Sequence, residues 1–319
     1  MRLRYMLTGL GGLALMAACG VPADTPEVEP PPPAEAPAVN ILELSAPGMY
    51  FEGPASIPSG WVTVKFDNPS GMVHFAMLER LPEGITIEDQ TREVPPRFQA
   101  GFDALVAGDT DAAMAEFGQL PAWYGDMVFL GGPGLLAAGG TGEASIFLEP
   151  GRYSIECYVK SGGVFHTYDP GTGERAMLHE LIVTEEDSGA VEPEASVTLS
   201  VDNAGIHIAE GAFAPGPNMV RVNYDEQMVH GNFVQSDVHV ARLMPDTDLA
   251  ALDAWMDWRA PHGLETPAPV EFVGGLNEMP AGSHGYFTLD LEPGDYALIG
   301  EVDGPAEKGF FVAFSVEGE

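Results

Sequence analysis

Residues 129–159 read FLGGPGLLAAGGTGEASIFLEPGRYSIECYV, and residues 272–302 read FVGGLNEMPAGSHGYFTLDLEPGDYALIGEV. The two stretches align without a gap and share F-x-G-G followed by L-E-P-G-x-Y. A duplicated segment of this length indicates two related structural units. The sequence therefore predicts one domain over residues 39–187 and a second over residues 195–319, joined by a polar, proline-containing linker at 188–194.

Short runs within each unit alternate apolar and polar residues and are bounded by Gly and Pro. Examples are Trp61–Phe66, Ala144–Leu148, Tyr153–Cys157 and Glu180–Thr184. This pattern predicts half-buried antiparallel strands, and their spacing predicts an all-β chain built from β-sandwiches. Two stretches with helical spacing, residues 103–117 and 246–258, predict a short helical insertion in each sandwich.

The N-terminal segment predicts export. A basic start precedes an apolar run from Tyr5 to Ala18, which is too short to remain as a transmembrane span. The run ends in LMAACG, which resembles the bacterial lipobox. The resemblance implies that residues 1–19 are a lipoprotein signal peptide and that Cys19 carries the lipid that holds the protein on a membrane. Residues 20–38 are rich in proline and acidic side chains and predict an extended tether.

The residue after Cys19 and the overall charge narrow the location and the partners. Gly20 is not aspartate, and resemblance to enterobacterial lipoproteins then implies the periplasmic face of the outer membrane. The chain has 48 acidic and 13 basic residues, a formal charge of −35. This charge disfavours nucleic acid and anionic lipid headgroups as partners. The acidic residues are dispersed, which is typical of a solvated surface.

Potential metal ligands follow two of the expected strands. Residues 68–74 read NPSGMVH, and Cys157, His166 and Met177 follow a later strand. This arrangement resembles the cupredoxin family of blue-copper proteins. In that family the first histidine follows an N-x-x-G-x-x-H turn, and Cys, His and Met lie on the loop before the last strand. The resemblance implies two tandem cupredoxin-like Greek-key β-sandwiches.

The same resemblance implies one copper ion of type 1. His74, Cys157 and His166 would be its three strong ligands and Met177 its weak axial ligand. His179 is a second candidate for the axial position, because ten residues separate His166 from Met177 where the family has about four. Thiolate and thioether favour Cu(I) whereas imidazole tolerates both oxidation states. The sequence therefore predicts electron transfer, with a redox partner protein, or copper handling.

The rest of the sequence limits this prediction. The second unit has Gly300 at the position of Cys157, so we expect no copper site there. Glu156 precedes Cys157, where a copper nitrite reductase has a histidine that binds a second copper, and a His-Cys-His run is absent. We therefore predict that the chain is not an enzyme. A metal-free binding or structural protein of the cell envelope, with Cys157 as a buried thiol, is the alternative.

Overall fold

Strands dominate residues 38–171 and 176–318, which are the residues that the computed structural model describes. The predicted signal peptide, Cys19 and all of the tether except residue 38 lie outside these residues. In the first half of the described chain the strands are β1 (Ile41–Ser45), β2 (Ser56–Asp67), β3 (Met77–Arg80), β4 (Val128–Phe129), β5 (Thr141–Leu148), β6 (Gly151–Glu156), β7 (Lys160–Ser161), β8 (Val164–Phe165) and β9 (Leu178–Asp187). In the second half they are β10 (Val197–Asp202), β11 (Gly205–Glu210), β12 (Gly216–Tyr224), β13 (Val238–Leu243), β14 (Glu271–Leu276), β15 (Ser283–Leu291), β16 (Gly294–Ile299) and β17 (Phe311–Val316).

The strands form the layers expected of β-sandwiches, and the all-β prediction is confirmed. In the first half, β1, β2 and β5 form one layer, and β9, β6, β3 and β4 form the other. Strand β2 belongs to both layers, and Gly60, with φ of +105°, lies where its partner changes from β9 to β5. Only glycine accepts this backbone conformation without strain. In the second half, β11, β10, β12 and β15 face β14, β13, β16 and β17.

Alternating side chains build the interior of each sandwich. Successive side chains of a strand point to opposite faces, so every second residue can be buried. On β2, Val62, Val64 and Phe66 are at most 1 % exposed. On β10, Val197, Leu199 and Val201 repeat the pattern. Burial of each such side chain contributes about 1.5–3 kcal/mol, so these cores are a main source of stability.

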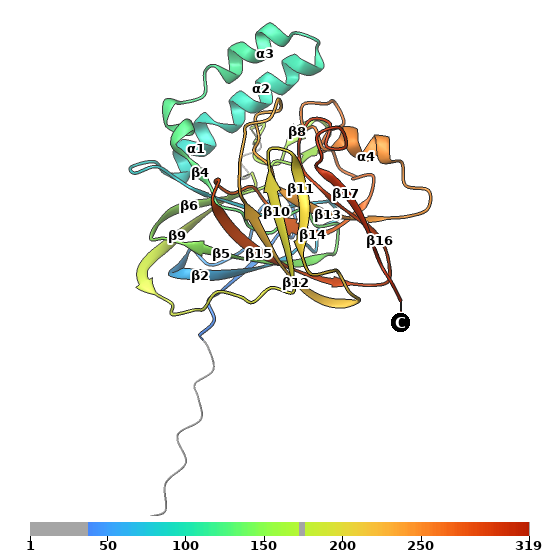
Figure 1. Ribbon diagram of the computed structural model, residues 1–319. Helices are drawn as coiled ribbons and strands as arrows, with labels where there is room; N and C mark the ends of the chain where they lie inside the picture. The colour runs from blue at the N-terminus through green and yellow to red at the C-terminus, as the bar shows by residue number, and fades with distance from the viewer. Residues whose placement is uncertain (1–37, 172–175, 319) are drawn as a thin grey trace, which may run out of the picture. The chain divides into compact units, whose positions relative to one another are not determined.

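The duplicated stretches meet each other in the structure. Strands β5 and β15 are antiparallel neighbours, and Ala144 pairs with Phe287 (Figure 1). An isolated bridge joins Pro133 to Leu276. In both pairs the two residues occupy equivalent positions of the repeat, 143 residues apart. The two halves are therefore related by a local two-fold axis, as in a symmetric dimer whose subunits have been joined.

Helices lie where the sequence predicts an insertion in each half, with some differences in extent. They are α1 (Ile87–Glu93), α2 (Pro95–Val106) and α3 (Thr110–Phe117), followed by the 3-10 helix η1 (Ala122–Asp126), in the first half and α4 (Leu249–Trp255) in the second. The single helical stretch expected at 103–117 is the end of α2, a turn and α3, because Gly108 has φ of +79° and Asp109 caps the next helix. Helix α1 was not predicted; a capping box of Thr86 and Asp89 begins it.

None of the helices within the described residues combines the length and the hydrophobicity required to cross a bilayer.

Candidate metal centre

His74 follows β2 through a turn that Asn68 holds together. The Asn68 side chain is fully buried, and its amide group donates hydrogen bonds to three carbonyls, those of Met72 (2.8 Å), Leu136 (3.1 Å) and Ala137 (3.1 Å). The backbone of His74 forms two further hydrogen bonds with that of Leu136. The turn and the glycine-rich duplicated stretch therefore both hold His74 in position.

Cys157 and His166 lie on either side of a small hairpin. Cys157 directly follows β6, and the hairpin β7–β8 turns at Gly162 and Gly163, whose φ angles are +60° and +76°. Two consecutive positive φ angles are typical of a type I′ turn. The N–H of His166 donates to the carbonyl of Val159 (2.8 Å) and closes the hairpin. The long gap between Cys157 and His166 is thus an ordered hairpin that brings their side chains together.

Three of the four predicted ligands meet in the interior. The Cys157 Sγ lies 3.5 Å from His74 Nδ1 and 3.8 Å from His166 Nδ1. The three donor atoms all lie within 4.8 Å of one another. None of the three residues is exposed to solvent. One metal ion could therefore contact a sulfur and two nitrogen atoms supplied by distant parts of the chain.

Burial sets the protonation of these three side chains. It lowers the pKa of His74 to about 4 and, together with a smaller effect of the nearby His74, lowers the pKa of His166 to about 3. Burial raises the pKa of Cys157 to about 12. Near neutral pH both imidazoles are therefore neutral, with lone pairs available to a metal, and a metal ion would have to displace one proton from the thiol.

The hydrogen bonds of the three donors favour a cation between them. Ser161 Oγ donates to Met72 Sδ (3.4 Å) and lies 2.9 Å from His166 Nε2, so it can accept the proton of that nitrogen. His166 then turns the lone pair of Nδ1 toward Cys157. When the proton of His74 is on Nε2, this residue also directs the lone pair of its Nδ1 toward Cys157. A single S–H group can satisfy only one of two nitrogen lone pairs, whereas a metal ion satisfies all three donors, and one thiolate with two imidazoles suits copper.

Contacts around the donors add residues that the sequence did not point to. The backbone N–H groups of Phe75 and Val159 donate to the Cys157 sulfur and lower its pKa, against the larger effect of burial. Such bonds stabilise a thiolate and thereby a metal–sulfur bond. Ser161 is the third residue of this kind, because it contacts His166. Backbone donors cannot be read from residue identity, because they depend on how the strands pack.

Met177 and His179, the two candidates for the axial position, lie in different surroundings. Met177 is fully buried; its N–H donates to the carbonyl of His166 (2.7 Å), and its carbonyl accepts from the N–H of Cys157 (3.3 Å). His179 is half-buried on β9, and its Nε2 donates to the carbonyl of Pro54 (3.2 Å). The backbone of Met177 thus adjoins both Cys157 and His166, whereas the ring of His179 is engaged elsewhere.

Among the described residues of the second half, no such group of one thiol and two imidazoles occurs. The pairing of β3 with β6 and of β13 with β16 places His239 at the position of Met77, so that Ser236 and Gly300 stand where His74 and Cys157 stand in the first half. Neither residue at these positions offers the imidazole or the thiol of the first half, and the absence of a copper site in the second half stays a prediction.

A different buried group occurs there, formed by Asp237, His239 and Glu301. His239 Nδ1 accepts a hydrogen bond from the N–H of Leu135 (3.1 Å), so a neutral imidazole carries its proton on Nε2. That nitrogen lies 2.7 Å from Asp237 Oδ2. In this arrangement a buried histidine lies against a buried carboxylate, and its other ring nitrogen is already engaged by the backbone of Leu135.

Comparisons with known proteins agree with the fold. No protein-family model and no curated protein matches the chain. Similar solved structures include auracyanin A, a "blue" copper protein from Chloroflexus aurantiacus (19% identity over 45% of this chain and 98% of that one, TM-score 0.26). A multicopper oxidase is similar at 13% identity over 87% of this chain and 88% of that one, with a TM-score of 0.21. The copper nitrite reductase of Nitrosomonas europaea is similar at 12% identity over 88% of this chain and 93% of that one, also with a TM-score of 0.21. At these identities and TM-scores the likeness concerns no more than the fold.

These structures correct one prediction. The sequence predicted that the chain is not an enzyme, yet a multicopper oxidase and a copper nitrite reductase are among the structures it resembles. The prediction rested on Glu156 beside Cys157 and on the missing His-Cys-His run, and both exclude only further copper bound directly next to this cysteine. They say nothing about chemistry elsewhere in a two-domain chain, and the prediction is withdrawn.

Proposed function

We propose that the chain is an extracytoplasmic copper-binding protein that holds one copper ion at His74, Cys157 and His166 and uses it in electron transfer or copper handling. Lipid on Cys19 would hold it on the cell envelope, and Met177 would be the axial ligand. The observation that carries the proposal is the convergence of a thiol and two neutral imidazoles on one buried point.

Each of the three ligands has a partner that limits its movement. Asn68 fixes the turn before His74, Ser161 contacts the far nitrogen of His166, and two backbone N–H groups reach the Cys157 sulfur. Copper bound to such ligands supplies a one-electron couple. Rigid ligands keep the rearrangement between the two oxidation states small, as rapid electron transfer to a redox partner protein requires.

The second half supports the ligand loop. Lys160, in β7, is fully buried and donates from Nζ to the carbonyls of Trp258 (2.6 Å) and Ala260 (3.1 Å). The backbone of Lys160 also pairs with residues 264 and 266. We infer that the second half holds the hairpin between Cys157 and His166 in its place.

Copper titration of the purified protein tests the proposal. Cu(II) should bind at one equivalent and produce an intense visible thiolate-to-copper absorption band. Cys157→Ser should abolish the band, and His166→Gln should weaken copper binding at least tenfold. Met177→Leu should retain one copper but shift the band and the reduction potential.

His179→Gln is the matched control, because this histidine lies on a nearby strand and its ring contacts Pro54. It should leave the band and the stoichiometry unchanged. If the wild type develops no band with Cu(II) and takes up no Cu(I), the metal-free alternative holds. A band that survives Cys157→Ser would show that copper binds elsewhere.

A further inference from the structure

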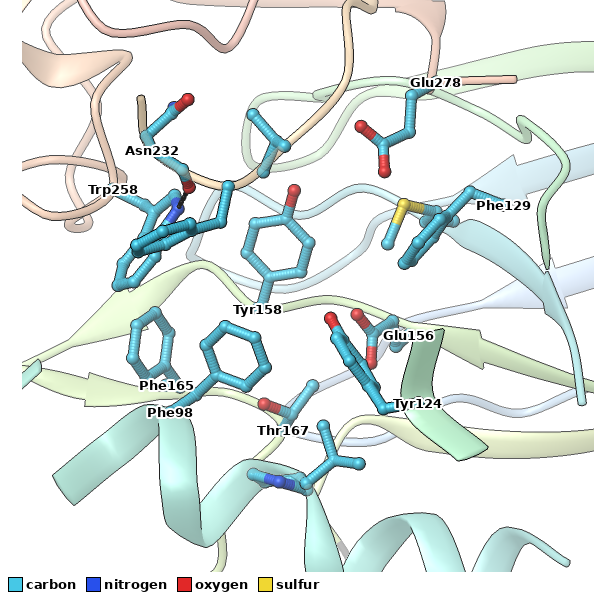
Figure 2. Close-up of a pocket in the computed structure, with 15 residues that line it drawn as sticks. Phe98, Tyr124, Phe129, Glu156, Tyr158, Phe165, Thr167, Asn232, Trp258 and Glu278 are labelled. Atoms are coloured by element: carbon cyan, nitrogen blue, oxygen red, sulfur yellow. Dashed lines mark hydrogen bonds between the residues drawn. The ribbon is translucent and has the colours of Figure 1, made fainter. Parts of the chain in front are cut away.

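A cavity of about 60 Å³ lies between the two halves, next to the candidate metal centre. Its wall includes Glu156 and Tyr158, which flank Cys157, and Phe165 and Thr167, which flank His166 (Figure 2). A water molecule occupies about 10–15 Å³ on this scale, so the cavity has room for roughly four waters or for a ligand of similar size. The copper centre as proposed makes no use of this space.

Glu278 supplies a buried carboxyl group to the cavity. It comes from the second half and is only 5 % exposed, and Figure 2 shows its carboxylate directed into the space between the labelled side chains. One oxygen, Oε2, accepts a hydrogen bond from the N–H of Gln235 (2.6 Å). Asn232, which also lines the cavity, is fully buried, and its Oδ1 has no hydrogen-bond partner among the described residues. A buried polar oxygen without a partner is costly unless a ligand satisfies it.

The charges around the cavity are acidic. No lysine or arginine is among the described residues that line it. Burial and, to a smaller extent, the nearby carboxyl groups of Asp237 and Glu79 raise the pKa of Glu278 to about 8. This carboxyl group resists ionisation because nothing positive is near it, and a cation in the cavity would supply the missing charge.

Aromatic rings form most of the remaining wall. The rings that line the cavity include Phe98, Tyr124, Phe129, Tyr158, Phe165 and Trp258. They pack on one another, with ring centroids 5.7 Å apart for Phe98 and Tyr124 and 5.9 Å apart for Phe98 and Trp258. The faces of aromatic rings attract cations, and a ring of aromatic residues with a carboxylate suits an alkylated ammonium group better than a hydrated ion.

A metal ion fits the cavity less well. Hard cations such as Ca²⁺ take six or more oxygen ligands at short distances. The groups of three or more potential ligands that converge within the described residues are the two given above, and neither Glu156 nor Glu278 belongs to them. The carboxylates of the cavity are therefore too dispersed for a metal, whereas an organic cation needs only one of them.

We propose that this cavity binds a small alkylammonium cation of about four heavy atoms, with Glu278 facing its charge and the aromatic rings, including Phe98 and Trp258, packed around its alkyl groups. This makes the protein a binding protein for small amines in addition to any role of the metal centre. The candidate ligands themselves do not line the cavity, and Glu278 and Phe98 lie on segments that carry none of them, so variants at these two positions test the cavity separately from the metal centre.

Calorimetric titration of the purified protein with trimethylammonium chloride tests this site. We expect saturable binding at one equivalent. Sodium chloride at equal ionic strength, the neutral tert-butanol and the oversized tetraethylammonium ion should each bind at least tenfold more weakly. Glu278→Gln retains an oxygen for the N–H of Gln235 but removes the charge, and it should weaken trimethylammonium binding at least tenfold.

Three further variants make the result decisive. Glu307→Gln removes an exposed acid far from the wall of the cavity and should leave binding unchanged. Phe98→Leu removes one ring without changing charge and should weaken binding several-fold, and it carries the test should Glu278→Gln fail to fold. Cys157→Ser should bind trimethylammonium normally, which separates this proposal from the copper proposal. The proposal is overturned if trimethylammonium binds no better than sodium, if Glu278→Gln and Phe98→Leu bind like the wild type, or if only a divalent metal competes for the site.

Discussion

Asn68 shows how one buried side chain places a candidate ligand. Its amide is shared among the carbonyls of Met72, Leu136 and Ala137, which belong to two segments of the chain. The Asn68 carbonyl oxygen accepts a hydrogen bond from Ser70 Oγ (2.7 Å). Because the amide donates and accepts at once, neither aspartate nor leucine could replace it without leaving buried polar groups unpaired.

We predict that Asn68→Ala lowers the free energy of unfolding by about 2–3 kcal/mol, because it removes the buried hydrogen bonds that join the turn to Leu136 and Ala137. Urea denaturation would measure this change. Asn68→Asp is the matched comparison: it keeps the shape but cannot donate, and it should destabilise at least as much. If Asn68→Asp were as stable as the wild type, the donated hydrogen bonds would not be what fixes the turn.

Lys160 is a second residue whose environment has a measurable consequence. Its ammonium group is buried, contacts two carbonyls and lies 3.7 Å from the centre of the Phe102 ring. Burial lowers its pKa to about 7. In the unfolded chain lysine keeps its proton up to about pH 10.4, so between pH 7 and 10 the unfolded state binds more protons. The contribution of Lys160 to stability therefore rises with pH across this window.

We predict that the stability difference between the wild type and Lys160→Met shifts in favour of the wild type as the pH rises from 7 to 10. Below pH 7 the difference should be constant. Urea denaturation at a series of pH values would measure it. Lys65→Met is the control, since Lys65 is partly exposed beside Glu143 (3.4 Å), and its difference from the wild type should vary little over this range. A flat curve for Lys160→Met would contradict the assignment.

At the scale of elements, the hairpin β7–β8 decides whether Cys157 and His166 can meet. Its turn requires left-handed backbone at Gly162 and Gly163. A Cβ atom at Gly162 would meet nothing within 4 Å, so a substitution there acts through the backbone alone. Gly71, in the turn before His74, is equally open but lies outside the left-handed region. The two glycines thus form a matched pair.

We predict that Gly162→Ala destabilises the protein by about 1–2 kcal/mol, the cost of a left-handed alanine. Gly71→Ala should be neutral or slightly stabilising, because alanine restricts the unfolded chain. Chemical denaturation would compare the two variants, and copper affinity should fall only for Gly162→Ala. Equal effects at the two positions would show that the turn conformation is not what matters.

At the scale of the whole molecule, the two halves share one sheet. Strand β5 of the first half pairs with β15 of the second, and the glycine-rich stretch before β5 pairs with the end of β14 (Figure 1). The sheet runs without interruption from β11 to β4. Neither half can keep these backbone hydrogen bonds without the other, and separation would expose a sheet edge.

We therefore predict a single cooperative unfolding transition, in which secondary structure and tryptophan fluorescence change together. Trp123, which donates to Glu93 (3.1 Å), reports on the first half, and Trp255, which donates to the carbonyl of Glu265 (2.8 Å), reports on the second. Urea denaturation followed by circular dichroism and by fluorescence would test this. Replacement of either tryptophan by phenylalanine should leave one midpoint for both probes. Two separate midpoints would mean that the halves unfold independently.

The sequence determined much of this protein by itself. Alternating apolar residues specified the strands, because one face of a sheet must be buried. The repeat indicated two related units, and the motif N-P-S-G-M-V-H with Cys157 and His166 indicated the candidate ligands. These features are local, so residue order is sufficient to reveal them.

Only the tertiary structure decided how these parts combine. It placed the repeats against each other, brought the nitrogen atoms of His74 and His166 to the sulfur of Cys157, and enclosed Glu278 in an aromatic cavity between the halves. Distances between residues far apart in the chain, and the burial that shifts their pKa values, arise from packing. For that reason the sequence, in which acidic residues are abundant, could not show which few carboxyl groups the fold buries.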